Sequence, residues 1–238
     1  DLGADSTTRA FNYFHLTYAL LQNGFYKESN EFMQKSLALD PKGFFAVHVK
    51  AYVNTIDRVD WATAKTILEE EYRRVPTRFD ILSDIGMVNF MQRDFASARR
   101  CYDSALAIMH GFKMDVLAPN YMYVGVSHQK TGDPEGAKYY FDQFKLFADK
   151  GQTIYKDLHL ATYELHAGNG QKALELFTRF ANEQKYFISL VLLIADDPMI
   201  DGIRNEKAFQ EGLKKMNTNF WTHHKKLDEQ WRPRFEKL

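Results

Sequence analysis

The chain has 238 residues, 45% of them hydrophobic, which is enough for one large domain or a repeat array with a continuous core. Lys plus Arg number 31 and Asp plus Glu number 31, so the net charge of zero excludes a global field that would attract nucleic acid or an anionic membrane. A single cysteine, Cys101, excludes a disulfide within the chain and favours a reducing compartment, which we expect to be the cytoplasm.

The first ten residues have neither a basic start nor an apolar run, so we expect no secretory signal peptide. They also lack an initiator Met, which suggests a processed chain or part of a longer protein. The longest apolar run, from Tyr186 to Ala195, is far shorter than the roughly 20 residues that a membrane-spanning helix needs. We therefore expect no association with a membrane.

The first predicted element is a helical hairpin over residues 10–43. Gly24 marks the turn between its two helices, because glycine tolerates a positive φ, and Pro41 ends the second helix, because the residue before proline avoids the α region. Counted from Ala10, repeat positions 4, 7, 15, 20, 24 and 32 hold Tyr13, Leu16, Gly24, Ser29, Met33 and Pro41. This spacing resembles the tetratricopeptide repeat, a helix–turn–helix unit of 34 residues.

The pattern returns four more times, over residues 44–77, 78–112, 117–151 and 153–187. Position 20 needs a small residue, because two helix backbones approach closely there. It holds Ser29, Ala64, Ala98, Ala137 and Ala173, which are separated by 35, 34, 39 and 36 residues. The resemblance implies that residues 1–187 form about five stacked hairpins in a right-handed α-α superhelix, an all-α fold completed by C-terminal capping helices.

A different pattern begins after the fifth hairpin. Residues 188–216 predict a degenerate sixth hairpin or cap, with Pro198 near a helix start, because the last repeat has to hide its apolar face. The spacing of Asp197, Pro198, Phe209 and Leu213 resembles the ends of tetratricopeptide regions in bacterial signalling proteins and transcriptional regulators.

Residues 217–238 predict a C-terminal helical tail, which Pro233 is expected to end. Its apolar stripe, with spacings of four, three and four, consists of Phe220, His224, Leu227 and Trp231. Basic residues beside the tryptophans leave nucleic-acid binding as an alternative. Acidic residues dilute this basic charge, so we favour a packed capping helix and expect no direct binding of nucleic acid.

No catalytic signature appears: the sequence has no Walker loop, no Gly-x-Ser-x-Gly elbow and no His-Glu-x-x-His helix. Cys101 has no identifiable base, which favours an inert packed thiol over a nucleophile. His159 and His166 share a helical face but lack a third ligand, so we expect no metal site. We therefore expect a protein that is not an enzyme and that has no cofactor.

In tetratricopeptide proteins the first helix of each hairpin lines the concave surface of the superhelix. The resemblance therefore assigns to this surface, as partner-binding residues, Phe14, Tyr18, Val53, Met87, Met122, Tyr123 and His159. The implied wall is apolar and aromatic, and two explanations stay open: a groove for a protein or peptide partner, or burial by the curvature of the superhelix or by the tail helix. A second copy that closes the wall as a homodimer is a further alternative.

Relatives that bind chaperones hold a peptide carboxylate with a clamp of lysine and asparagine residues. The corresponding positions here hold Phe14, Tyr18, Lys50, Asp80 and Asp84, so the clamp is missing and the two aspartates would repel a carboxylate. The sequence argues against a chaperone adaptor. It favours a non-enzymatic interaction module, expected to be the sensor or assembly region of a larger bacterial signalling or transcriptional regulator. The alternative is a structural scaffold in a multiprotein complex, without regulatory output.

Overall fold

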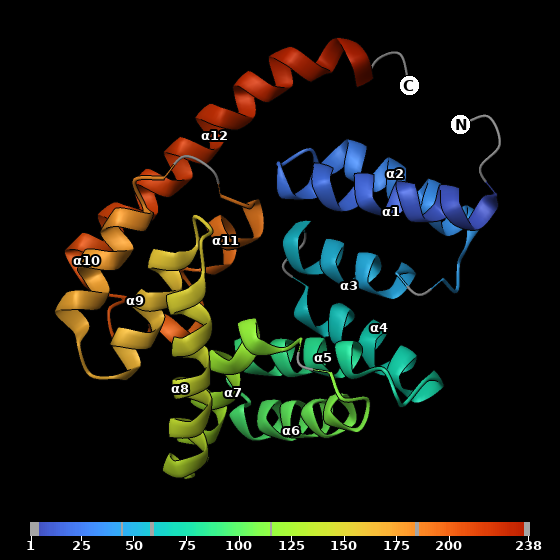
Figure 1. Ribbon diagram of the computed structural model, residues 1–238. Coiled ribbons are helices and arrows are strands. Elements are labelled where there is room, and N and C mark those ends of the chain that lie inside the picture. The colour runs from blue at the N-terminus through green and yellow to red at the C-terminus, as the bar shows by residue number, and fades with distance from the viewer. Residues whose placement is uncertain (1–4, 44, 58–59, 115, 184–185, 236–238) are drawn as a thin grey trace.

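The structure, a computed structural model, describes residues 5–43, 45–57, 60–114, 116–183 and 186–235, and every regular element in those ranges is a helix (Figure 1). The first ten α-helices of these ranges form five hairpins: α1 (Ser6–Gln22) with α2 (Tyr26–Leu39), α3 (Ala46–Asp57) with α4 (Trp61–Arg74), α5 (Phe79–Met91) with α6 (Phe95–Gly111), α7 (Tyr121–Lys130) with α8 (Pro134–Lys150), and α9 (Lys156–His166) with α10 (Gly170–Phe180). A 3-10 turn, η1 (Ala118–Asn120), precedes α7. Over the described part of the chain, no helix combines the length and the apolar character that crossing a membrane requires.

Aspartates begin several of the second helices. The carboxylates of Asp60, Asp94 and Asp133 accept hydrogen bonds from the backbone N–H three residues later, over 2.9, 3.0 and 2.9 Å. Each bond satisfies an N–H group that has no partner inside its helix, which fixes where α4, α6 and α8 start.

Small residues let the two helices of a hairpin approach closely. A Cβ atom added to Gly86 on α5 would lie 2.9 Å from the ring of Tyr102 on α6. One added to Gly125 on α7 would lie 2.5 Å from the ring of Phe141 on α8. The aromatic side chain of each second helix therefore fills the place that the glycine leaves open.

The turn inside a hairpin uses a residue in the left-handed region. Glycine takes this place at Gly24, Gly132 and Gly168, with φ of 82°, 80° and 86°. In the third hairpin the place belongs to Arg93, whose φ of 63° is costly for a residue with a Cβ atom. Its guanidinium forms bonds of 2.5 and 2.9 Å with the carboxylate of Asp201, so this strained turn anchors the C-terminal segment.

After the fifth hairpin, the chain forms a cap without a complete sixth hairpin. The predicted first helix is reduced to α11 (Ile188–Leu193), and a 3-10 turn, η2 (Pro198–Ile200), follows it. The final helix, α12 (Lys207–Phe235), has 29 residues and runs without a break through residue 216, where we expected the cap to end and a separate tail to begin.

The expected end of the tail helix at Pro233 is not observed, because α12 continues to Phe235. Proline removes one backbone hydrogen bond and crowds the carbonyl four residues earlier. Because Pro233 lies near the last described residue of α12, few of the described helical bonds depend on it.

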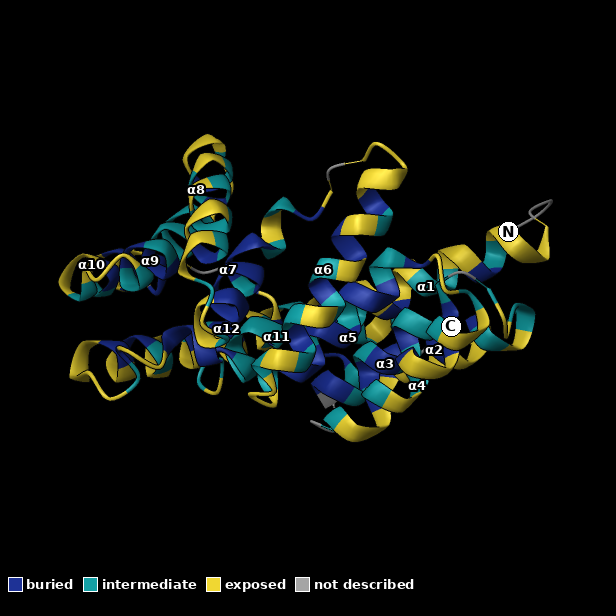
Figure 2. Cartoon of the chain, turned by 90° about the horizontal axis from the view of Figure 1, so that it is seen from below, coloured by how far each residue is buried: buried dark blue, intermediate teal, exposed yellow. Residues whose placement is uncertain are grey.

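Two apolar cores hold the molecule together, and Figure 2 shows buried positions between neighbouring helices and exposed positions on outward faces. The first core joins hairpins two to four through residues such as Leu68, Ile85, Phe90, Tyr102, Val124 and Phe144. The second joins the two ends of the chain through residues such as Leu21, Val53, Ile56, Ile188, Phe209 and Phe220. The cap is therefore part of the same core as the first hairpin.

Helix α12 returns to the turn of the first hairpin and closes the superhelix (Figure 1). The Nδ1 atom of His224 donates to the carbonyl oxygen of Asn23 over 2.7 Å, and the rings of Phe25 and Phe235 lie 5.3 Å apart. Gly24, between Asn23 and Phe25, has little room for a side chain, because an added Cβ atom would lie 3.2–3.3 Å from His224 and Phe220.

Closure by α12 predicts that Gly24→Leu destabilises the protein more than Gly132→Leu does. Both glycines have a positive φ, so both variants carry a similar backbone cost of about 1–2 kcal/mol. Only the side chain at residue 24 would wedge against α12, since nothing lies within 4 Å of a Cβ atom at Gly132. We expect an additional loss of about 1–3 kcal/mol in urea unfolding. Equal losses in the two variants would show that α12 does not pack on the first hairpin.

Candidate functional site

A cavity of about 600 Å³ lies on the concave face of the superhelix. One side comes from α1, α3, α4, α5 and α7, and the opposite side comes from α11 and the residues after it. Its apolar lining includes Phe14, Tyr18, Leu21, Phe45, Tyr52, Val53, Trp61, Met87, Leu190 and Ile194. The volume and the lining are those of a ligand-binding pocket, for which about 300–1,000 Å³ is typical.

The structure brings together most of the residues that the sequence assigned to the concave surface. Phe14, Tyr18, Val53, Met87 and Tyr123 all line the cavity. The other two predicted residues, Met122 and His159, do not line the cavity.

Met122 precedes Tyr123 on α7 and points into the core of hairpins two to four, where its side chain is fully buried. His159 lies on α9 in the fifth hairpin, outside the cavity, with its ring 5.6 and 5.5 Å from the rings of Phe144 and Phe147. Neither side chain is placed to touch a ligand in this cavity.

Sequence reasoning missed the wall that α11 provides. This wall includes Ser189, Leu190, Leu193, Ile194 and Asp197. The available signal was the apolar run from Tyr186 to Ala195, which is too uniformly apolar for a helix with one side in water. The run indicated burial, but its burial against the concave faces of α1 and α3 depends on contacts far apart in the sequence.

Helix α11 covers part of the concave wall and leaves part of it open. Val49, Val53 and Ile56 on α3 are almost fully buried, and they share a core with Ile188 and Ile194. At the rim, however, Tyr18 remains 42% exposed. Burial within the chain therefore accounts for the apolar residues of α3, but not for the aromatic rim on α1.

The aromatic rim is built from stacked pairs between α1 and the start or middle of α3. The rings of Phe14 and Phe45 lie 4.6 Å apart, and those of Tyr18 and Tyr52 lie 5.2 Å apart. The Tyr52 hydroxyl is hydrogen-bonded to Gln22, and burial raises the pKa of this hydroxyl above its ordinary value. Ser189 on α11 donates to the Gln22 amide oxygen over 3.0 Å, so this chain of bonds joins α1, α3 and α11.

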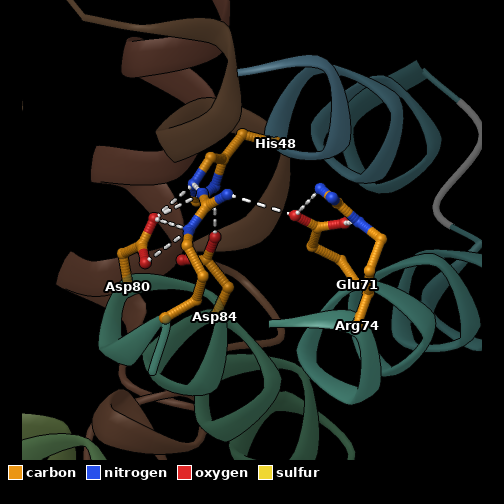
Figure 3. A network of polar contacts seen from close by, with 6 residues as sticks. His48, Glu71, Arg74, Asp80 and Asp84 are labelled. Carbon is orange, nitrogen blue, oxygen red and sulfur yellow. Dashed lines mark hydrogen bonds and ion pairs between the residues drawn. The ribbon is translucent and has the colours of Figure 1, made fainter. Parts of the chain in front are cut away.

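A network of charged side chains lies at one end of the cavity, around His48 on α3 (Figure 3). The Nδ1 atom of His48 lies 2.7 Å from Asp84, and its Nε2 atom lies 2.8 Å from Asp80. Arg78 donates to Asp80 over 2.6 Å and is 3.3 Å from Glu71. The two carboxylates beside the ring nitrogens favour the doubly protonated imidazolium, while the guanidinium of Arg78, 2.9 Å from Nε2, opposes it.

The network balances its own charge. Its cations are His48, Arg74 and Arg78, and its anions are Glu71, Asp80 and Asp84. Burial alone would lower the pKa of His48, but its hydrogen bonds to Asp80 and Asp84 outweigh that effect and raise the pKa to about 9. The same bonds, with those from Arg78, hold the pKa of Asp80 well below its usual range despite burial.

Asp197, on the α11 side of the cavity, has no such balance. Its carboxylate accepts from the backbone N–H of Met199 over 2.8 Å and from the hydroxyl of Tyr123 over 3.2 Å. Burial raises the pKa of this carboxyl to about 6, although both hydrogen bonds act in the opposite direction. Within the described ranges, no cationic side chain forms an ion pair with Asp197.

The nearby arginines are engaged by Asp201. Arg93 and Arg204 bind its carboxylate over 2.5 and 2.6 Å, and the two guanidinium groups hold the pKa of Asp201 at about 2. Arg204 also donates to the backbone carbonyl oxygen of Asp197, not to its carboxylate. The Asp201 carboxylate thus contacts two guanidinium groups and the Asp197 carboxylate contacts none, although the charge of Arg204 still acts on Asp197, and of the two aspartates only Asp197 lines the cavity.

The residues with catalytic or metal-binding potential lie apart from one another. Burial raises the pKa of the Cys101 thiol, so the thiolate is disfavoured, although the Asn89 amide donates to the sulfur over 3.7 Å. On α9, burial lowers the pKa of His159 and His166, and His166 donates to the carbonyl oxygen of Met199 over 3.1 Å. In the part of the chain that the structure describes, no group of three or more His, Cys, Asp or Glu side chains is placed to hold a metal ion.

The charge on His48 predicts a loss of stability at alkaline pH. Its pKa is about 9 in the fold against 6.5 for the free side chain, so the stabilisation is complete below pH 6.5 and disappears as the pH rises through 9. Allowing for solvent screening at Asp84, we expect the free energy of unfolding to fall by about 2 kcal/mol between pH 6 and 9.5. His48→Gln should lack this fall, and His110→Gln, at an exposed histidine, should retain it. Parallel urea titrations of the two variants would reveal any error in this assignment.

Asp197 predicts the unusual result that a variant gains stability at neutral pH. Its carboxyl pKa is raised to about 6, so its favourable contribution is complete only below pH 3.8 and is lost as the pH rises through 6. Asp197→Asn keeps an oxygen for the N–H of Met199 and removes the charge, so we expect it to be about 1–2 kcal/mol more stable than the natural protein at pH 7.5. The difference should vanish near pH 4. The matched variant Asp196→Asn, at an exposed neighbour, should show neither effect; a destabilised Asp197→Asn protein at pH 7.5 would contradict the prediction.

Comparison with known proteins supports the fold. No protein-family model and no curated protein matches the sequence. Among solved structures, PilF of Pseudomonas aeruginosa superposes with a TM-score of 0.54 and 16% identity, over 87% of this chain and 90% of PilF. PilW superposes with a TM-score of 0.54 and 19% identity, over 89% of this chain and 93% of PilW. A tetratricopeptide repeat protein of Parabacteroides merdae aligns with a TM-score of 0.44 and 14% identity, over 94% and 88% of the two chains. At these identities the PilF and PilW likenesses show the fold alone, and the chain is an all-α superhelix of tetratricopeptide-type hairpins with a C-terminal cap.

Proposed function

We propose that the chain is a non-enzymatic protein-interaction module for assembly, which holds an apolar segment of a partner protein in the cavity on its concave face. The observation that carries this proposal is the cavity itself, with its volume of about 600 Å³ and its aromatic rim. Tyrosine and methionine side chains, such as Tyr18 and Met87 here, suit recognition because they offer large contact areas and adaptable packing.

The volume of the cavity supports an occupant. The cavity has a volume of about 600 Å³ and is open to solvent at the rim, where Tyr18 remains exposed. The space therefore has to hold solvent or a ligand. Most of its walls cannot hydrogen-bond to water, which favours an apolar ligand group over ordered solvent.

The apolar surface continues beyond the cavity, which favours a chain segment over a small molecule. Phe11 and Tyr18 lie seven residues apart on α1, and each is 42% exposed. Residues with this spacing share one face of a helix. A partner that enters the cavity beside Tyr18 could extend along this face toward Phe11.

The likeness to PilW, a type IV pilus biogenesis factor, supports an assembly role over a purely sensory one. The alternative that the sequence raised, a sensor region of a bacterial signalling or transcriptional regulator, stays a prediction, because it rests on the resemblance of the cap alone. The cytoplasmic location and a homodimer also stay predictions.

A peptide-display library of random nine-residue segments tests the proposal. We expect selection on the purified chain to enrich apolar segments, and Tyr18→Ser to weaken the best of them at least tenfold, because the variant removes a ring from the rim. The matched control is Tyr139→Ser, since Tyr139 is also exposed but lies on α8, away from the cavity. Thermal unfolding should show that both variants remain folded, with a loss of about 1 kcal/mol for the Tyr18–Tyr52 stack.

Two results would count against this function. A library that yields no specific segment would contradict the proposal that the chain is an interaction module. Segments that bind both tyrosine variants equally well would place recognition on another surface.

A further inference from the structure

Resting on the proposed function, we infer that the partner segment carries a positively charged side chain, lysine or arginine, between apolar residues, and that this cation pairs with Asp197 inside the cavity. The inference depends on three observations: the unpaired carboxylate of Asp197, its position on the cavity wall, and the charge balance of the other groups that line the cavity.

The charge of the cavity wall is the first step. The ionisable side chains on the wall that carry a charge are His48, Asp84 and Asp197, which give one positive and two negative charges when His48 is protonated. Asp84 is bound to His48 over 2.7 Å within the balanced network described above. Among the side chains on the wall itself, one negative charge remains and belongs to Asp197; the nearby guanidinium groups of Arg93 and Arg204 bind Asp201 and do not contact the Asp197 carboxylate.

The local bonding of Asp197 is the second step. Its two hydrogen bonds, from the Met199 N–H and the Tyr123 hydroxyl, come from neutral donors, which hold a carboxylate in place without neutralising it. A carboxylate has about four acceptor positions, so these two donors leave room for a third. A structural role as the cap of η2 needs only the bond to Met199, and asparagine or serine would fill that role without a buried charge.

The apolar surroundings are the third step. An ammonium or guanidinium group on a flexible apolar stem can pack its methylene groups against Leu193 and Met87 while its charge meets Asp197. A carboxylate ligand would meet Asp84 and Asp197 and be repelled, and an uncharged apolar ligand would leave Asp197 unpaired.

Calorimetry with capped five-residue peptides tests this inference. Each peptide has a central lysine, norleucine or glutamate between leucines, so the three differ in charge at one position. On the natural protein we expect the lysine peptide to bind at least tenfold more tightly than the norleucine peptide, and the glutamate peptide to bind more weakly than both. On Asp197→Asn we expect the preference for lysine over norleucine to disappear.

The matched control is Asp196→Asn, which makes the same change in net charge at an exposed neighbour that does not line the cavity. It should keep the preference for lysine. If Asp197→Asn fails to fold, Asp197→Ser, which also caps η2, replaces it. If Asp196→Asn lost the preference for lysine as fully as Asp197→Asn does, the inference would be overturned. The preference would then depend on the net charge of the protein and not on Asp197.

The outcomes separate this inference from the proposed function. If the norleucine peptide binds as tightly as the lysine peptide, the cavity is a binding site for apolar segments and only the cationic partner is excluded. If no peptide of this set and no segment of the display library binds, the proposed function fails as well. A further arm uses n-hexylammonium, which has the same cation without a peptide; binding as tight as that of the lysine peptide would overturn the assignment to a partner protein.

Discussion

The contact between α12 and the turn of the first hairpin is the constraint on which the rest of this structure depends. A row of helical hairpins normally contacts only its neighbours, so its two ends are independent. Here His224 and Phe220 pack over Gly24, and residues of α1, α3, α11 and α12 share one apolar core. Because the ends are joined, α11 is held against the concave faces of α1 and α3, and an open wall becomes a cavity.

Two aspartates in the segment between α11 and α12 have different partners. Asp201 takes two guanidinium groups and fastens the cap to the turn after α5. Asp197 receives only neutral donors and stays ionised at neutral pH at a cost in stability, because burial disfavours its charged form. Buried charged groups that lower the stability of a protein are characteristic of binding sites, where a ligand supplies the missing partner.

Arg93 combines a strained backbone conformation in the turn of its hairpin with a side-chain contact to a distant part of the chain. Its equivalents in three other hairpins are glycines, which adopt the left-handed turn without strain. A single strained residue costs of order 1–3 kcal/mol, which the rest of the hairpin can support. In exchange, the guanidinium of Arg93 reaches Asp201 and fixes the segment that carries Asp197.

The sequence by itself determined the hairpins, because the small, aromatic and turn residues at fixed spacing act between helices that are adjacent in the chain, as Gly86 and Tyr102 do. It also determined much of the cavity rim, since Phe14, Tyr18, Met87 and Tyr123 occupy first-helix positions. Only the tertiary structure decided that α11 forms the opposite wall and that Asp197 faces the cavity without a cation. Those features depend on how far the superhelix turns before its ends meet, which is a sum over every hairpin interface and which no local pattern of residues encodes.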